Sequence, residues 1–322
     1  MSGLLSRDGV IMNRLLLILN PNAGMRRANR FLPEILRLFI EHGYRCETFI
    51  TGASGEAASF LEECGTPFDL VVCAGGDGTL NETIAGMLKA GLDCRLGYIP
   101  CGTTNDYAAS IGLSSDVLRA ARDIVEGRAR NIDIGSFNGR YFVYTATCGA
   151  FARASYTTSQ AAKNLLGHTA YILEGIRDLT AIKPLHLHVE ANGMVLDEDF
   201  IFCSITNSTS IGGILKLDSQ LVALNDGRFE VTLVRNPVNP AQFSSILYGL
   251  TTQELPNEMI HFFSSDHITV TSDVPIEWTL DGEREPETTE ATLVNLHSVV
   301  RIIIPENGEE VPLVPESEED DE

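Results

Sequence analysis

The stretch from Phe68 to Glu82 constrains the fold of this chain more than any other. Its first part, Leu70–Ala74, is an apolar run long enough for a buried strand of a parallel sheet. A glycine-rich loop at 75–78 follows, and the apolar residues after it recur at helical spacing (Leu80, Ile84, Met87, Leu88). A strand, a glycine loop and a helix in this order indicate an α/β fold with a ligand site at the loop.

The residues of this loop suit a phosphate ligand. Glycine lets the backbone approach a ligand closely and adopt positive φ, and Gly75, Gly76 and Gly78 supply three such positions. The start of the helix adds backbone N–H groups and the positive end of its dipole. Asp77 could hold a magnesium ion or orient a phosphate, because a carboxylate among phosphates normally needs a cation between them. A glycine-rich hairpin loop fits the order of the elements less well.

Strands and helices alternate from residue 12 to about 130, which predicts a parallel sheet with helices on both faces. The other predicted strands of this part are Leu15–Leu19, Tyr44–Ile50 and Leu96–Ile99. Loops rich in Gly, Ser, Thr, Asn and Asp follow all the strands (Asn20–Gly24, Thr51–Ser54, Gly75–Thr79, Cys101–Asp106). Because ligands of open α/β sheets bind at the carboxyl ends of the strands, we expect these loops to form one site.

The pattern changes after Asp133, where short strands separated by turns become dominant. The predicted strands are Tyr141–Ala146, Leu185–Glu190, Phe200–Thr206, Arg228–Val234, Ile268–Thr271 and Ile276–Leu280, and the predicted helices are Lys163–Leu179 and Pro240–Leu250. Asn192-Gly193 and Asn225-Asp226-Gly227 are typical hairpin turns. We therefore expect an α/β domain over 1–133 and a mostly antiparallel β domain over 134–291. Val299–Ile304 is a last strand that the pattern alone assigns to neither domain.

Composition excludes several classes of protein. The net charge of −21 argues against nucleic-acid binding, and no apolar run approaches the roughly 20 residues that span a bilayer. Seven scattered cysteines without a C-x-x-C pair indicate reduced thiols and a cytoplasmic location. Residues 306–322 contain no Lys or Arg and many acids, which predicts a disordered tail.

Two turns stay ambiguous on pattern alone. Asp281-Gly282-Glu283 is first of all a strand-ending turn with exposed acids, and Asn225-Asp226-Gly227 is first of all a hairpin turn. Thr103, in the loop after Leu96–Ile99, becomes a candidate ligand contact because this loop shares a sheet edge with the glycine loop.

Taken together, five motifs resemble those of the bacterial diacylglycerol kinase catalytic-domain family, soluble lipid kinases that include sphingoid-base kinases. The resemblance covers roughly residues 12 to 305. The matching segments are Asn20–Gly24, Gly75–Glu82, Pro100–Ala108, Asp133–Gly135 and Asp281–Glu283. The central loop alone is less specific, since NAD kinases and phosphofructokinases carry a similar one.

The resemblance implies a kinase that uses ATP and Mg²⁺ to phosphorylate a lipid hydroxyl. It implies a β-sandwich-like second domain, a last strand (near 292–305) that joins the first domain, and an active site in the cleft. Glu283 would be the general base, and Asp77 and Asp133 would shape the catalytic network. The implied ATP contacts are Asn20, Pro21, Asn22, Ala23, Gly24, Thr51, Gly76, Asp77, Gly78, Thr79, Leu80, Asn81, Glu82 and Thr103.

The resemblance also places a structural Mg²⁺ at the turn after Ala223. Its one side-chain ligand would be Asp226, with the carbonyl oxygens of Ala223 and Arg228 on either side and water completing the shell, an arrangement that suits magnesium. The simpler interpretation is a turn without a metal, in which Asp226 caps its own backbone.

The acceptor that the resemblance implies is diacylglycerol, reached by a transient, peripheral contact with a membrane surface. Leu217-Asp218 departs from the proline and small residue of many relatives, so a sphingoid or other lipid stays open. Two further functions stay open as well: a NAD-kinase-like enzyme with a soluble substrate, and a nucleotide-binding regulator without catalysis. For the oligomeric state we keep a homodimer as one option.

Overall fold

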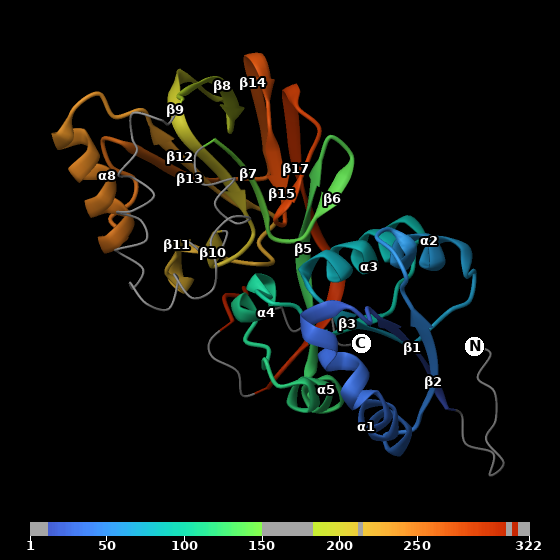
Figure 1. Cartoon of the computed structure of the whole chain (residues 1–322). Helices are drawn as coiled ribbons and strands as arrows, with labels where there is room; N and C mark the ends of the chain where they lie inside the picture. Colours follow the sequence, from blue (N-terminus) through green and yellow to red (C-terminus); the bar gives the residue numbers. More distant parts are fainter. Residues whose placement is uncertain (1–11, 150–182, 212–214, 307–310, 315–322) are drawn as a thin grey trace. The chain divides into compact units, whose positions relative to one another are not determined.

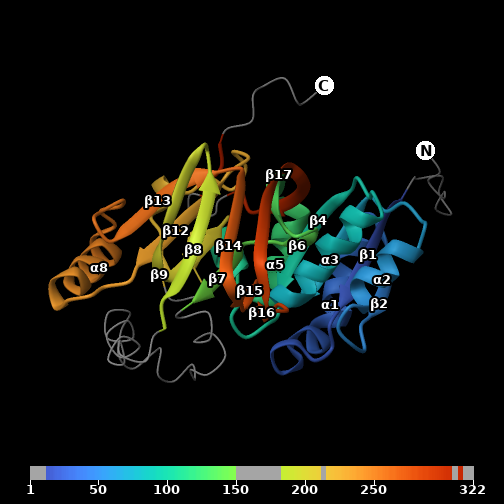
Figure 2. The same cartoon turned by 90° about the horizontal axis from the view of Figure 1, so that it is seen from above.

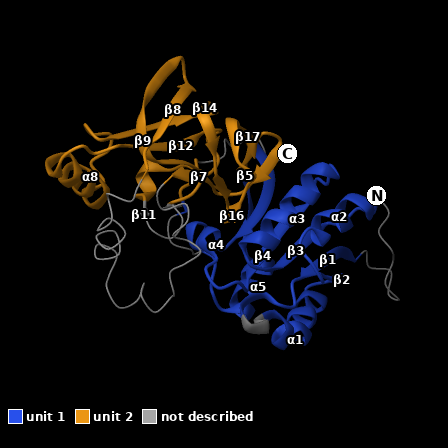
Figure 3. Ribbon diagram, turned by 45° about the horizontal axis from the view of Figure 1, so that its top comes forward, with its two compact units in different colours: residues 1–132, 298–311 blue, residues 133–297, 312–322 orange. Residues whose placement is uncertain are grey.

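The computed structural model describes residues 12–149, 183–211, 215–306 and 311–314. The chain divides into two compact units, shown in separate colours in Figure 3. Unit 1 contains residues 1–132 and 298–311, and unit 2 contains residues 133–297 and 312–322. Two strands, β5 (Arg128–Phe137) and β17 (Thr288–Ile304), contain residues of both units. The chain therefore crosses between the units within regular structure.

Unit 1 is built on a parallel sheet with the strand order β17–β4–β3–β1–β2. The four strands beside β17 are β1 (Asn13–Leu19), β2 (Tyr44–Ile50), β3 (Leu70–Gly75) and β4 (Arg95–Pro100). Every residue of β3 is buried, which explains why its sequence is a continuous apolar run rather than an alternating one.

Helices cover both faces of this sheet, as predicted (Figure 1). The helices are η1 (Ala23–Arg26), α1 (Arg27–Glu41), α2 (Glu56–Glu63), α3 (Asp77–Lys89), α4 (Asp106–Ser110) and α5 (Val117–Glu126). Helices α1 and α5 contact each other, and so do α2 and α3. Ile35 and Phe39 of α1 join Ala121 and Ile124 of α5 in the core against β1 and β3. The sheet is thus enclosed, and its ligand-accessible edge is the one at the strand ends.

Unit 2 is mostly antiparallel β. Its strands are β6 (Arg140–Phe142), β7 (Thr145–Gly149), β8 (Leu185–Ala191), β9 (Met194–Thr206), β10 (Ser210–Ile211), β11 (Leu215–Lys216), β12 (Phe229–Arg235), β13 (Ile260–Ser265), β14 (His267–Ile276), β15 (Trp278–Leu280) and β16 (Glu283–Arg284). Its described helices are η3 (Ser219–Leu221) and α8 (Pro240–Thr252). The two-residue turn Asn192-Gly193 joins β8 to β9 with φ of 52° and 74°, which confirms the predicted hairpin.

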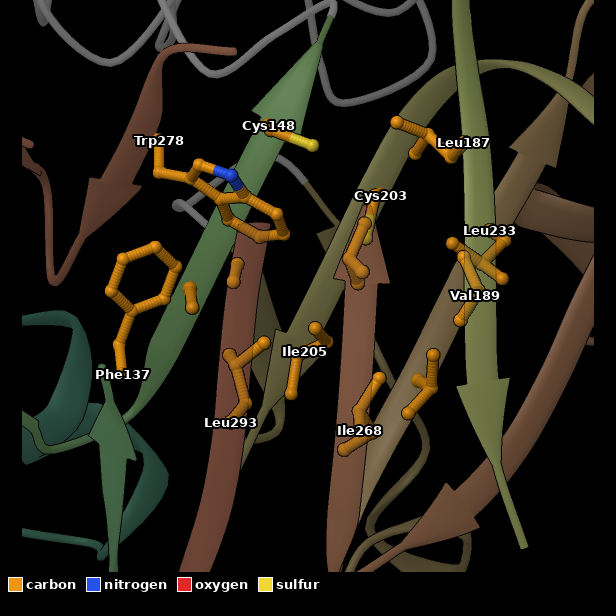
Figure 4. Close-up of a cluster of buried hydrophobic side chains, with 14 of the residues drawn as sticks. Phe137, Cys148, Leu187, Val189, Cys203, Ile205, Leu233, Ile268, Trp278 and Leu293 are labelled. Atoms are coloured by element: carbon orange, nitrogen blue, oxygen red, sulfur yellow. The ribbon is translucent and has the colours of Figure 1, made fainter. Parts of the chain in front are cut away.

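The long strand β9 belongs to two sets of strands. Its first half pairs with β8, which continues through β14 to β17 (Figure 2), and its second half lies between β7 and β12. Apolar side chains of both sets meet in one core, which Figure 4 shows. Phe137, Leu187, Ile268 and Leu293 come from one side of this core, and Trp278 with its neighbours comes from the other. This is the sandwich-like packing that the resemblance implies.

Two predictions in unit 2 need correction, and one strand of this unit was missed. The single strand expected over Tyr141–Ala146 is two strands, β6 and β7, because the backbone at 143–145 turns its N–H groups toward the carboxylate of Asp281. The turn Asn225–Gly227 is not a hairpin, since it follows η3 and leads into β12. Strand β13 was not predicted, because the adjacent, half-buried Phe262 and Phe263 break the alternating pattern.

Residues 311–314 of the tail that the sequence predicts to be disordered lie in the described part of the chain. Residues 311–314 lie beside the segment Leu224–Asn225, whose backbone N–H donates to Pro312 O at 2.8 Å. Asn225 exchanges two hydrogen bonds with Val314. Val, Pro, Leu and Val interrupt the acids here, so this part of the tail carries apolar side chains. The predicted helix Lys163–Leu179 lies outside the described residues.

Candidate functional site

The N-terminus of α3 is the centre of the candidate site in unit 1. Gly76 is the N-cap and carries no side chain that could cap the helix. Gly75 has no space for a side chain, because a Cβ there would lie 2.5 Å from Cβ of Thr79. The 13-residue helix therefore presents its first turn at the end of β3, a geometry that suits an anion.

Glycines also bring the neighbouring loops close to this turn. A Cβ on Gly102 would lie 2.7 Å from Cα of Gly76, so the loops after β3 and β4 pack backbone to backbone. Gly24 has φ of +46°, and a Cβ there would lie 1.8 Å from the carbonyl oxygen of Cys101. Larger residues at these positions would force the loops apart.

Side-chain hydrogen bonds join the loop after β1 to α3. Nδ2 of Asn20 donates to Oγ1 of Thr79 at 3.0 Å, and Oδ1 of Asn20 accepts the N–H of Asn22 at 3.0 Å. The carbonyl of Pro21 accepts from Asn29. Ala23 begins the short helix η1 directly after this turn. The predicted segment Asn20–Gly24 is thus placed against the glycine loop.

Asp77 joins α3 to α4 rather than pointing away from the loops. Its Oδ2 accepts the N–H of Asp106 at 3.0 Å, and its Oδ1 accepts from the hydroxyl of Tyr98 at 3.4 Å. The same hydroxyl lies 3.4 Å from Oδ1 of Asn105, whose side chain closes the turn onto Gly102. These bonds hold the carboxylate of Asp77 at the start of α3, beside the loop after β4.

Glu82 organises the loop after β2. Its Oε1 accepts from Oγ of Ser54 at 2.8 Å and from N–H of Gly55 at 2.7 Å. Thr51 is buried, and its N–H donates to the carbonyl of Leu19 at 2.9 Å. Leu80 lies in the core, and its N–H donates to Gly76 O within the first turn of α3. Thr103 is exposed in the loop before α4.

The structure therefore brings together the unit 1 loops that the sequence singled out. Gly78, Thr79 and Asn81 lie in the first two turns of α3, at the same strand edge as the loops after β1, β2 and β4. The arrangement offers helix N–H groups, glycine backbone and the carboxylate of Asp77. It can hold a phosphate chain together with a cation.

Asp133 lies in unit 2 and is fully buried on β5. Its Oδ2 accepts the N–H of Gly227 at 2.6 Å, and its Oδ1 lies 3.0 Å from Nδ1 of His297. The backbone N–H of Asp133 donates to Leu224, and its carbonyl accepts from Asn207 at 2.9 Å. These contacts make Asp133 the anchor of the turn at 224–227.

The same turn carries the predicted metal ligand Asp226. Its Oδ1 accepts the N–H of Arg228 at 2.9 Å, which is the local contact expected of a turn without a metal. Nearby Glu230 is buried, and its Oε2 has no hydrogen-bond partner among the described residues. Burial first, and then the charge of Asp226, raise the pKa of Glu230 to about 9. The unpartnered Oε2 of this buried carboxyl, near the carboxylate of Asp226, fits a cation at this turn.

The described residues contain no ready-made cluster of metal ligands, however. Within 12–149, 183–211, 215–306 and 311–314, no three His, Cys, Asp or Glu side chains form a group that could hold a metal ion. An ion at Asp226 would therefore depend on backbone carbonyls, such as those of Ala223 and Arg228, and on water.

The segment Asp281–Glu283 forms the turn between β15 and β16. The buried carboxylate of Asp281 accepts three consecutive backbone N–H groups, from Val143 at 2.6 Å, Tyr144 at 2.9 Å and Thr145 at 3.1 Å. Asp281 and Gly282 have φ of 48° and 86°, as a tight turn requires. The turn is thereby fixed to the start of β7.

Glu283 itself is accessible. Its side chain is 55% exposed, and its Oε2 lies 3.5 Å from Nη2 of Arg140. The other terminal nitrogen of Arg140 lies 2.6 Å from Oε1 of Glu285. Burial raises the pKa of the Glu285 carboxyl, and the charge of Arg140 opposes this effect. An accessible carboxylate on an anchored turn can accept a proton from a ligand.

Sequence reasoning missed Arg140, Tyr98 and Glu230. Arg140 and Tyr98 carried no signal, because each acts on a residue far away in the sequence. Glu230 did carry one, since a carboxylate alternates there with Phe229, Val231 and Leu233 of a buried strand.

Known proteins and family models match this sequence over nearly its whole length. Residues 14–137 match the family model of the diacylglycerol kinase catalytic domain, and residues 145–304 match that of the YegS C-terminal NAD kinase beta sandwich-like domain. A diacylglycerol kinase of Bacillus subtilis is 32% identical over 93% of this chain and 99% of its own length. A diacylglycerol kinase of Staphylococcus carnosus is 28% identical over 94% of this chain and 98% of its own length. A crystal structure of a Bacillus anthracis protein provisionally assigned as a diacylglycerol kinase has a TM-score of 0.77 at 22% identity, covering 92% of this chain and 97% of its own.

Proposed function

Since the chain belongs to the diacylglycerol kinase family, we propose that it transfers the γ-phosphoryl group of ATP to the free hydroxyl of diacylglycerol and so forms phosphatidic acid. The observation that carries this proposal is the meeting of loops at the N-terminus of α3. Helix N–H groups, close-packed glycines and Asp77 together suit a polyphosphate, and phosphoryl transfer depends mainly on positioning and charge stabilisation.

In the proposal, unit 1 holds the nucleotide. The backbone of Gly76–Thr79 would bind phosphate oxygens, and the loops Asn20–Gly24 and Thr103 would border the rest of the molecule. The hydrogen bonds of Glu82 to Ser54 and Gly55 would keep the loop after β2 in place. Asn20 and Thr79 bind each other, so they would act as one wall of the site.

Glu283 of unit 2 would serve as the general base. Its carboxylate would accept the proton of the lipid hydroxyl while that oxygen forms a bond to the γ-phosphorus and the bond to ADP breaks. Asp281 would position this group, because its three backbone hydrogen bonds anchor the turn that carries Glu283.

Magnesium enters the proposal at two places. When bound, a divalent ion supplies neutralising charge between the phosphates, and Asp77 is the carboxylate that would face it. A second, structural ion would lie at Asp226, where the buried Oε2 of Glu230 fits a nearby cation. One carboxylate ligand implies weak binding at this second place.

The acceptor resides in a bilayer, so we propose a cytoplasmic enzyme that touches the membrane surface transiently. Within the described residues, no helix is long and apolar enough to cross a membrane. A homodimer also belongs to the proposal, and sedimentation equilibrium at micromolar concentration tests it.

Transfer of labelled phosphate from ATP to a panel of acceptors tests the function. The panel contains diacylglycerol and a sphingoid base in detergent micelles, and NAD in solution. We expect label in phosphatidic acid that depends on added diacylglycerol. Label in another acceptor would replace the substrate, and nucleotide binding without any transfer would indicate a regulator.

A pair of variants tests the role of Glu283. Glu283→Gln keeps the shape of the side chain and removes the proton acceptor, so kcat should fall by about 10²–10⁴-fold with ATP affinity retained. The matched control is Glu287→Gln, which neutralises an exposed carboxylate four residues further on and should leave kcat unchanged. Equal turnover by the two variants would exclude Glu283 as the base.

A further inference from the structure

The C-terminal segment Pro312–Val314, which we call the clasp, lies against the turn that precedes β12. The N–H of Leu224 donates to Pro312 O at 2.8 Å. Asn225 binds Val314 twice, since its Nδ2 donates to Val314 O at 3.1 Å and its Oδ1 accepts the N–H of Val314 at 2.7 Å. The clasp and the turn both belong to unit 2. Three hydrogen bonds therefore join the C-terminal segment to this turn.

The two sides of this contact differ in burial. Leu224 is fully buried and Asn225 is 8% exposed, whereas Val314 is 47% exposed. A hydrogen bond contributes about 0.5–1.5 kcal/mol net, and a buried group that loses its partner adds a penalty. All three bonds use the backbone of the clasp. A change of side chain in the clasp should therefore leave them in place, while loss of a backbone N–H removes one.

The same turn is fixed to Asp133 on its inner side. The carbonyl of Leu224 accepts the N–H of Asp133 at 2.9 Å, and the N–H of Gly227 donates to Oδ2 of Asp133 at 2.6 Å. Leu224 thus binds the clasp through its N–H and Asp133 through its carbonyl. The clasp, the turn and β5 form three layers, each held to the next by hydrogen bonds.

The structural ion of the proposed function would use atoms of this turn. Asp226 would be its one side-chain ligand, and the carbonyls of Ala223 and Arg228 lie before and after the residues that the clasp and Asp133 hold. An ion with a single carboxylate ligand depends on both carbonyls staying in place. Because such an ion binds only one conformation of the turn, its apparent affinity falls by the fraction of molecules that leave this conformation.

We propose that the clasp sets the magnesium affinity of this turn, with Asn225 as the positioning residue that connects the two. The proposal rests on the proposed function, which places an ion at Asp226, and it adds control of that site by the C-terminal segment. Coupling between two binding events is reciprocal. The clasp should strengthen binding of the ion, and the ion should strengthen docking of the clasp by the same factor.

Val314→Pro tests the effect of the clasp on the ion. Proline has no N–H, so the substitution removes the bond to Oδ1 of Asn225 and changes no residue of the turn. Val314→Ala is the matched control, because it keeps the N–H. The probe is Mg²⁺ alone, added to the whole chain free of nucleotide, and the apparent Kd follows from the rise of the melting temperature. We expect a Kd about fivefold higher for Val314→Pro than for Val314→Ala, the effect of one lost hydrogen bond.

Hydrogen exchange tests the reverse effect, of the ion on the clasp. The exchange rate of the Val314 N–H is followed by mass spectrometry of C-terminal peptides, with and without Mg²⁺. Exchange in the wild type should slow about fivefold when Mg²⁺ is saturating, because the coupling factor is the same in both directions. In Asp226→Ala, Mg²⁺ should not change it. A contact with a structural role alone would exchange at the same rate with and without the ion.

Two results would overturn the proposal. One is an equal apparent Kd for Val314→Pro and Val314→Ala, even if the melting temperature of Val314→Pro is lower at every Mg²⁺ concentration, because the clasp would then only stabilise the fold. The other is an exchange rate of the Val314 N–H in the wild type that Mg²⁺ leaves unchanged.

Transfer of labelled phosphate, measured on the same preparations, separates this proposal from the kinase function. If the chain shows the coupling but transfers no phosphate to any acceptor, the clasp stands and the proposed activity fails. If it forms phosphatidic acid but shows no coupling, the activity stands and the clasp is refuted.

Discussion

Replacing Asp281 with Asn should loosen the turn that carries Glu283. The carboxylate accepts three backbone N–H groups at 2.6–3.1 Å in a buried position. The amide of Asn keeps one acceptor oxygen and turns the other into an NH₂ donor, which then faces a backbone donor. A hydrogen bond to a charged group contributes about 1.5–3 kcal/mol, and a buried donor without a partner adds a penalty. We therefore expect the free energy of unfolding of unit 2 to fall by about 2–4 kcal/mol.

The chain contains its own probe for this experiment. Trp278 is its single tryptophan, is 1% exposed and lies three residues before Asp281. Urea unfolding followed by its fluorescence should show a lower midpoint for Asp281→Asn, and kcat should fall because Glu283 loses its anchored position. Asp273→Asn, an exposed substitution on β14, is the matched control. A midpoint for Asp281→Asn equal to that of the control would refute the account of this turn.

Three further predictions concern other parts of the chain. Gly24→Ala should weaken ATP binding and lower the free energy of unfolding of unit 1, measured by thermal unfolding, by about 3 kcal/mol. Gly43→Ala is the control, since Gly43 also has positive φ but lies in open space, and it should cost only about 1 kcal/mol. Equal costs for the two variants would contradict the packing argument. Between pH 4.5 and about 9 the folded state keeps the proton of Glu230 and the unfolded state loses it, so stability falls as pH rises. Glu230→Gln should therefore raise the melting temperature at pH 8 but hardly at pH 4.5, and no gain at pH 8 would count against the raised pKa. Magnesium should raise the melting temperature of the nucleotide-free wild type but not that of Asp226→Ala. The control is Asp218→Ala, which removes another turn carboxylate and should respond to magnesium as the wild type does. If Asp226→Ala also responds as the wild type does, Asp226 is a turn residue only.

Local patterns predicted unit 1 well. The run Leu70–Ala74 and the helical spacing after it both lie within twenty residues, and β2 begins and ends where the sequence indicated. The glycines at 24, 75 and 102 could be expected at the loops, but not their partners. Gly24 faces Cys101, and Gly102 faces Gly76, only because the sheet places these loops side by side.

Contacts between distant residues explain what the sequence did not predict in unit 2. Asp281 divides the strand predicted over 141–146, although it lies 136 to 138 positions further along the chain than the residues it binds. No local pattern shows a contact of this kind. The hydroxyl residues Thr145, Thr147 and Ser204 carried no signal in the sequence, because hydroxyl residues are ordinary on the exposed face of a strand. Their register across four strands and their burial appear only in the folded sheet.

The path of β17 has a consequence for synthesis on the ribosome. The chain leaves unit 1 after Ile132 and returns to it at Ser298, where β17 adds a strand beside β4. Until then β4 is an unpaired edge in a nascent sheet, and unpaired edges invite association with other chains. Translation at roughly 5–20 residues per second makes this interval on the order of ten seconds or more. Chaperone binding to stalled nascent chains should therefore depend on whether β17 has left the ribosome.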